Sequence, residues 1–288
     1  MVISIQSQLR NSKSRLQIGL NVGRRAATLF FLGLVINSIG AGHNDLRSLR
    51  IPGVLQRFGI TYLIVGLLQA AFAQRELPSL NQDHLDQNTI PWWWQIRDIK
   101  ACFCQWIVML AVAAFHACLT FLLPIPGCPS GYLGPGGLHM HGNFSNCTGG
   151  AARYIDISLF GENHIYKVIS SRLRPTTFLV DVACFQNPSA KYIYDTKESF
   201  DPEGFLGSLT AAFLVFLGVQ CGYTLLLFSD WVPRIKRWLI WALILGTLAG
   251  GLCGFSKEDG AVPINKNLWS LSFTLALAAM AFFLLCIM

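Results

Sequence analysis

Two arginines and a glutamine stand at the start of an apolar run, where they could bind an anion. Arg50 lies just before Pro52, and Gln56 and Arg57 follow about one helical turn later. Proline is tolerated in a first helical turn, so the sequence predicts a helix from Pro52 that carries both side chains into a membrane span. The positive helix N-terminus and the two arginines would together favour an anion site. The alternative is a structural role for Arg57, either snorkelling to the membrane surface or a contact within the helix bundle.

Two more polar segments border apolar runs. Glu203 lies in residues 201–204, where a carboxylate either caps the next helix or pairs with an arginine or a cationic amine. Residues 265–270 lead into the last apolar run and offer amides, an indole and a hydroxyl as ligand-lining groups: Asn265, Asn267, Trp269 and Ser270. Tryptophan at this depth is also a common interface residue without any ligand.

The histidines give weaker signals. His139 and His141 have no further Cys, His or carboxylate ligands nearby, so we expect no metal site. His116 lies in an apolar run, where it could relay protons or make a contact within a helix bundle.

The composition places these residues in a membrane protein. The chain has 288 residues, of which 53% are hydrophobic and only 13% are charged, which excludes an ordinary soluble domain. The net charge of +7 comes from Lys and Arg scattered between apolar runs. We therefore expect a lipid bilayer as the partner of the chain, and no nucleic acid.

Apolar runs of about 20 residues predict an all-α polytopic transmembrane helix bundle with six spans. The expected spans are 24–42, 54–74, 100–123, 204–228, 234–254 and 268–288. The chain then divides into four parts: an N-terminal segment (1–23), spans one to three (24–123), a long polar loop (124–203) and spans four to six (204–288).

Charge predicts the orientation. Lys and Arg are concentrated in the segments that would lie on one face with the N-terminus, namely 1–25, 75–100 and 229–238. By the positive-inside rule, the N-terminus is cytosolic and the long loop lumenal or extracellular. That loop carries two glycosylation sequons, at Asn143 and Asn146, and two cysteines, Cys128 and Cys147, that an oxidising lumen would favour as a disulfide.

Four stretches together resemble the heparan-alpha-glucosaminide N-acetyltransferase family of lysosomal membrane enzymes. They are residues 50–57, residues 124–137 with 146–152, residues 201–204 and residues 265–272. The resemblance implies a multi-pass lysosomal protein that takes acetyl groups from cytosolic acetyl-CoA and passes them to the terminal glucosamine of heparan sulfate in the lumen. The sequence does not give the oligomeric state, and a homo-oligomer is left open. The residues named above from 50–57, 201–204 and 265–270 would bind the heparan sulfate oligosaccharide or acetyl-CoA.

The sequence also departs from this family. The family's active-site histidine lies upstream of the Arg-Ile-Pro-Gly segment, and nothing in residues 1–49 matches it, because His43 lacks the surrounding pattern. Residues 168–186 look inserted, and the apolar run 268–288 has no polar tail. We therefore assign no catalytic residue and expect an incomplete form without turnover of its own. The alternatives are a non-catalytic solute-binding or transport protein, or an inactive truncated isoform.

Overall fold

The computed structural model describes residues 1–41, 47, 49–75, 96–166, 195–196, 198–256 and 260–288. Within these residues the main elements are helices: α1 (Val2–Arg10), α2 (Arg15–Ala41), α3 (Val54–Phe72), α4 (Arg97–Ala101), α5 (Phe103–Leu122), α6 (Gly150–Phe160), α8 (Phe205–Leu227), α9 (Trp231–Cys253) and α10 (Leu271–Ile287). The expected insertion at 168–186 and His43 lie outside the described residues.

Five of the described helices are long and apolar enough to cross a membrane: α2, α3, α5, α8 and α9. This confirms the all-α polytopic fold. The sixth, α10, has 17 residues and lies at the short end of the range for a spanning helix. It begins at Leu271 rather than at residue 268, because Ser270 is its N-cap and accepts a hydrogen bond from the Phe273 amide.

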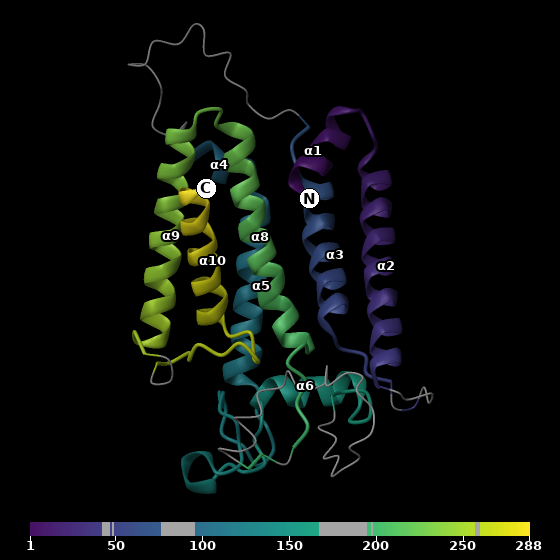
Figure 1. Cartoon of the computed structure of the whole chain (residues 1–288), viewed down its shortest axis with the longest axis vertical. Helices are drawn as coiled ribbons and strands as arrows, with labels where there is room; N and C mark the ends of the chain where they lie inside the picture. Colours follow the sequence, from purple (N-terminus) through teal and green to yellow (C-terminus); the bar gives the residue numbers. More distant parts are fainter. Residues whose placement is uncertain (42–46, 48, 76–95, 167–194, 197, 257–259) are drawn as a thin grey trace, which may run out of the picture.

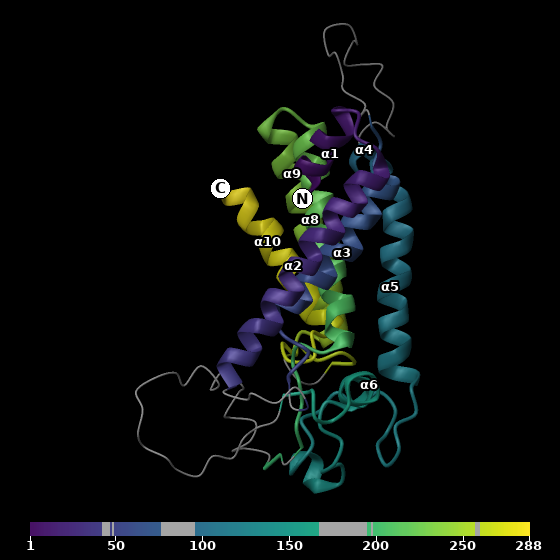
Figure 2. The ribbon, with the colours of Figure 1, turned by 90° about the vertical axis from the view of Figure 1, so that its right-hand side faces the viewer.

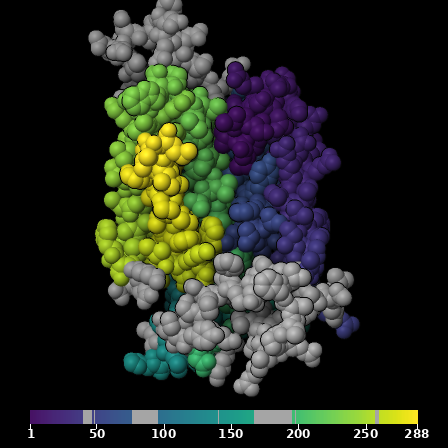
Figure 3. Space-filling view, viewed as in Figure 1, coloured from purple at the N-terminus to yellow at the C-terminus, as the bar shows by residue number. Residues whose placement is uncertain are grey.

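Helix α8 lies at the centre of the bundle. It packs against α3, α5, α9 and α10, and its buried residues are distributed around most of its circumference. Figure 2 shows α5 and α10 on opposite sides of it. On the face seen in Figure 3, α10 covers part of α8. The part of α8 that stays visible lies between α10 and the α2–α3 pair.

The two ends of the bundle differ. Helix α6 lies across the ends of the spans at one end, with the segment that precedes it (Figure 1). We refer to this end as the α6 end, and to the opposite end, where α1 and α4 lie, as the α1 end. A disulfide joins Cys128 and Cys147 at the α6 end, with their Cα atoms 5.7 Å apart.

Helices α2 and α3 approach closely because small residues face the contact. A Cβ atom added at Gly59 would lie 2.9 Å from the Ala26 carbonyl oxygen, and one added at Gly66 would lie 2.6 Å from a Val22 methyl. Such positions let two helix backbones meet within a membrane. Helix α2 also begins before residue 24, where Arg15 donates hydrogen bonds to the Ala70 and Ala73 carbonyls at the end of α3.

The expected helix start at Pro52 is wrong by two residues. Helix α3 begins at Val54, and Gly53 is its extended N-cap, with φ 176° and ψ 170°. The Asn37 amide of α2 donates to the Pro52 carbonyl at 3.0 Å and to the Arg50 carbonyl at 3.3 Å. These bonds fix the residues before α3 in an extended path.

Replacing Gly59 with leucine should lower the thermal unfolding midpoint of the chain purified in detergent, because the new side chain would collide with the α2 main chain. Overpacking of this kind costs about 1–3 kcal/mol. Fluorescence-detected size exclusion after heating measures the midpoint. The control is Gly218→Ala in α8, where a Cβ meets nothing within 4 Å and the midpoint should not fall. An unchanged midpoint for Gly59→Leu would refute the close contact.

Candidate functional site

Charged side chains from three segments meet at the α6 end, and an aromatic ring from a fourth segment joins them. The charged residues are Arg50 before α3, Arg57 in its first turns, Asp156 of α6, and Asp201 and Glu203 before α8; the ring belongs to Trp269 before α10. We refer to these six residues as the Arg57 cluster. It brings together three of the segments that the sequence singled out: residues 50–57, 201–204 and 265–270.

Arg50 holds both carboxylates of the 201–204 segment. Its Nε and Nη2 donate to the two Asp201 oxygens at 2.8 and 2.7 Å, and Nη2 also donates to Glu203 at 2.5 Å. The Asp201 side chain is fully buried. Burial opposes the charge on Arg50, but the two carboxylates outweigh it and raise the arginine pKa. Such a bidentate pair fixes both the distance and the orientation of the two segments.

Capping of α8 by a carboxylate was one of the two roles expected for residues 201–204, and the structure gives it to Asp156 of α6. Gly204 is the N-cap residue of α8, but glycine has no side chain that could accept a hydrogen bond. Asp201 instead accepts from the Tyr166 amide at 3.0 Å and from the Glu203 amide at 3.0 Å, besides its pair with Arg50. Glu203 therefore has the alternative role, that of an arginine partner.

Arg57 does not snorkel to the surface, because it is only 5% exposed. Its Nη2 donates to the Pro202 carbonyl, and its guanidinium lies over the Trp269 ring, 4.6 Å from the ring centroid. Gly207 of α8 makes room for this contact, since a Cβ there would lie 3.2 Å from Trp269 and 3.3 Å from Arg57. Among the described residues, the Arg57 Nε has no hydrogen-bond partner.

The 265–270 turn presents the Trp269 ring to Arg57. The Asn265 carboxamide oxygen accepts from the Asn267 amide at 2.9 Å, and the Ser270 hydroxyl accepts from the Asn265 amide at 3.1 Å. Trp269 has a positive φ of 49°, which is uncommon outside glycine. Its carbonyl accepts from Thr210 of α8 at 2.8 Å. Asn265 and Ser270 thus shape the turn, while Asn267 remains half-buried.

Asp156 is the member of the cluster that sequence reasoning missed. Its Oδ1 accepts from the Phe205 amide at 2.8 Å, so α6 supplies the cap for α8. Its Oδ2 is buried and has no partner among the described residues. Burial raises the pKa of Asp156 to about 7, and Asp201 adds to this effect, while the Phe205 amide and Arg57 oppose it. In the sequence, Asp156 is recognisable only as a single acid inside an apolar segment. That pattern does not indicate which residue it contacts.

Gln56 lies away from the cluster. It is 2% exposed, and its amide packs between Gly33 of α2 and Gly53, where an added Cβ would lie 2.4 Å from its oxygen in either case. Its Nε2 has no partner among the described residues. The structure therefore separates Gln56 from Arg57. The two sequon residues, Asn143 and Asn146, are exposed at the α6 end.

The histidines do not join the cluster through any hydrogen bond between described residues. His139 contacts the Tyr132 hydroxyl through Nδ1 at 3.1 Å. His116 is buried in α5, and its Nδ1 has no partner in the described part of the chain. No three His, Cys, Asp or Glu side chains of the described residues lie close enough to hold a metal ion.

A second buried carboxylate, Asp98 of α4, lies at the α1 end. It accepts from Arg237 of α9 at 3.0 Å, and from Gln220 and Thr224 of α8 at 3.2 and 3.3 Å. Both carboxylate oxygens of Asp98 therefore have a donor, and the hydrogen bonds join α4, α8 and α9.

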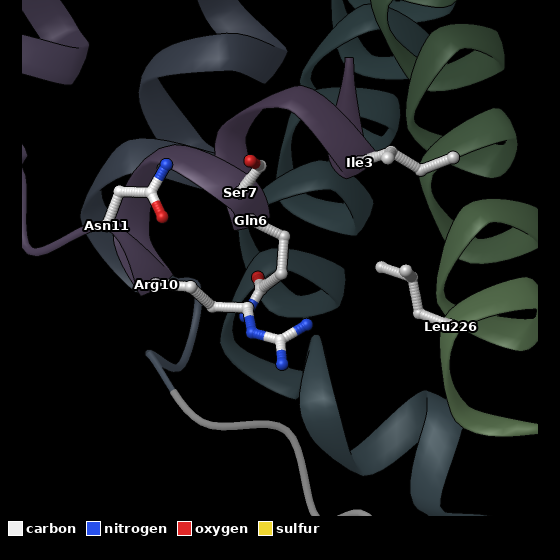
Figure 4. Close-up of a pocket in the computed structure, with 6 residues that line it drawn as sticks. All are labelled: Ile3, Gln6, Ser7, Arg10, Asn11 and Leu226. Atoms are coloured by element: carbon white, nitrogen blue, oxygen red, sulfur yellow. The ribbon is translucent and has the colours of Figure 1, made fainter.

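A groove of about 460 Å³ also opens at the α1 end (Figure 4). Leu226 of α8 lines one side, and α1 with its C-cap supplies the rest: Ile3, Gln6, Ser7, Arg10 and Asn11. The groove has no acid in its lining and lies at the opposite end from the Arg57 cluster. The cluster is therefore the candidate site, because there the buried Asp156 Oδ2, which has no donor among the described residues, lies close to the buried Arg57.

Comparison with known proteins supports the resemblance seen in the sequence. The chain is 36% identical to heparan-alpha-glucosaminide N-acetyltransferase of Homo sapiens and 37% identical to that of Mus musculus, in each case over 289 aligned positions. These alignments cover 99% of this chain and 40% of each relative, so the chain spans about two fifths of their length. No protein-family model matches the chain. The two relatives confirm the resemblance to this family over the matched part.

Replacing Arg50 with glutamine should destabilise the protein, because it leaves the buried Asp201 carboxylate without its cation. Breaking a buried pair in this way typically costs about 3–5 kcal/mol. Thermal unfolding in detergent measures the loss. Adding Asp201→Asn to the variant should restore part of the stability, and Arg10→Gln at the exposed α1 end should have no effect. Equal midpoints for Arg50→Gln and the parent would show that the pair contributes nothing.

The raised pKa of Asp156 predicts a pH-dependent stability. The folded state binds this proton more tightly than the unfolded state does, so the stabilising effect is complete below about pH 4 and is lost as the pH rises towards about 7. The unfolding midpoint should therefore fall between pH 5 and pH 7.5. In Asp156→Asn, which cannot ionise, this fall should be smaller. An identical fall in both proteins would contradict the assignment.

Proposed function

We propose that this chain forms the acceptor-binding part of a membrane N-acetyltransferase that moves acetyl from acetyl-CoA to the terminal glucosamine of heparan sulfate. The names of its two relatives support the reaction type. The observation that carries the proposal is the convergence of three separate segments on one buried place. Arg50 binds Asp201 and Glu203, and Arg57 contacts Pro202 and Trp269.

The chemistry of the cluster suits such an acceptor. A terminal glucosamine of heparan sulfate carries an ammonium group close to sulfates and carboxylates, so its site needs charges of both signs. The cluster provides two arginines and three carboxyl groups, and Arg57, Asp156 and Asp201 among them are buried, where electrostatic interactions are strong. An aromatic ring beside them, Trp269, adds the apolar surface that most small-molecule sites contain.

The orientation forms part of the proposal. In this arrangement the α6 end faces the lysosomal lumen and the N-terminus is cytosolic. The exposed sequon residues Asn143 and Asn146 and the disulfide at the α6 end support it, as do the Lys and Arg residues near the α1 end. Acetyl-CoA, which carries too much charge to cross hydrocarbon unaided, would approach from the cytosolic face.

Binding of the acceptor tests the proposal. The purified chain in lipid nanodiscs should bind a heparan oligosaccharide that ends in glucosamine, measured by titration calorimetry. Arg57→Gln should weaken binding by about tenfold or more, since it removes a charged donor from a buried site. Arg10→Gln at the α1 end should bind as the parent does.

Two results would count against the proposal: no binding of the oligosaccharide to the folded parent, or unchanged affinity in Arg57→Gln. Turnover is a separate measurement on the same sample. Incubation with acetyl-CoA and the same oligosaccharide should give no acetylated product above a heat-killed control, as expected from the unmatched histidine segment.

A further inference from the structure

One oxygen in the Arg57 cluster is both buried and unpaired. Asp156 is 1% exposed, and its Oδ1 is occupied by the Phe205 amide, whereas its Oδ2 has no donor among the described residues. Gly204 provides the space for it, because a Cβ at that glycine would lie 1.8 Å from Oδ2. A buried acceptor without a donor destabilises the folded chain, so the position of this oxygen needs a reason. Capping α8 explains Oδ1 alone.

The neighbouring charges distinguish Asp156 from the other acids. Asp201 and Glu203 are both held by Arg50, and Asp201 also accepts from two main-chain amides. Both carboxylates therefore already have a cationic donor in the folded chain. Arg57 faces Asp156 from α3, but it donates to the Pro202 carbonyl and forms no salt bridge within the described part of the chain. Among the three acids of the Arg57 cluster, Asp156 is thus the one with a buried oxygen that has no donor in the described part of the chain.

We propose that Asp156 is the proton acceptor for the amine of the bound sugar, an inference that rests on the proposed function. An amine must lose a proton before it can attack a thioester, because the ammonium nitrogen has no lone pair. In the proposed step, a proton passes from the ammonium nitrogen to Asp156 Oδ2. The products are a neutral amine and a neutral carboxylic acid, and no other bond changes.

The electrostatic balance of the cluster supports this step. The charges of Arg50 and Arg57 are matched by those of Asp201 and Glu203, so the ionised form of Asp156 adds one unmatched negative charge. A cationic amine would compensate that charge on binding. The burial-raised pKa of Asp156, about 7, makes its carboxylate a stronger proton acceptor than an ordinary aspartate.

The pH dependence of sugar binding tests the role. The folded chain in nanodiscs is titrated at several values between pH 5.5 and 7.5 with two oligosaccharides, one ending in glucosamine and one ending in N-acetylglucosamine. The amine-ended sugar should bind about tenfold more tightly at pH 7.5 than at pH 5.5, because Asp156 ionises over this range. The N-acetylated sugar has no ammonium group and should bind equally at both.

Asp156→Asn should remove the pH dependence and leave the weaker affinity, while retaining an acceptor for the Phe205 amide. Asp156→Ser is the second variant, since a serine hydroxyl also caps a helix, and it should behave in the same way. Glu162→Gln, which changes an exposed acid just after α6, is the matched control and should keep the parent profile.

The outcomes separate the two proposals. If the parent binds the amine-ended sugar but both Asp156 variants keep its pH profile, the role of Asp156 is wrong and the proposed function stands. If neither sugar binds to the folded parent, the proposed function fails, and the role of Asp156 fails with it.

Discussion

Charge removed from water is the constraint that determines the α6 end of this bundle. Three groups there are almost fully buried, and each is stabilised in a different way. The Asp201 carboxylate accepts two hydrogen bonds from one arginine. Arg57 donates to a carbonyl and lies over an aromatic ring. Asp156 accepts from a single amide, and burial raises its pKa to about 7. Since an unpaired charge in such a place costs several kcal/mol, these contacts restrict how the surrounding segments can pack.

The fold could be predicted well because the bilayer sets its main dimension. A span needs about 20 apolar residues, and such runs are visible in the sequence. Helix ends were predicted less well, since they depend on partners far away in the chain. Asn37 of α2 fixes the carbonyls before α3, and Arg15 extends α2 towards the end of α3. Neither contact can be recognised from a local pattern.

The candidate site could be predicted only in part. Arg57 and Trp269 stood out because charges and amphipathic rings are rare in apolar surroundings, and the structure brings them into contact. Gln56 was grouped with Arg57, yet consecutive helical residues point about 100° apart, and it faces α2 instead. Asp156 was overlooked, because its importance comes from the Phe205 amide and the missing side chain of Gly204, two features that only the folded chain brings together.

The two buried aspartates have a mechanical consequence for α8. Asp156 of α6 binds its first amide, and Asp98 of α4 binds Gln220 and Thr224 near its last turn. The central helix is thus anchored near both membrane faces, and sliding along its own axis would break charged hydrogen bonds at each end. The same two ends also hold the neighbouring helices, since Arg237 of α9 donates to Asp98 and Arg57 of α3 donates to the Pro202 carbonyl, so displacement of α8 would disturb the contacts of the helices around it.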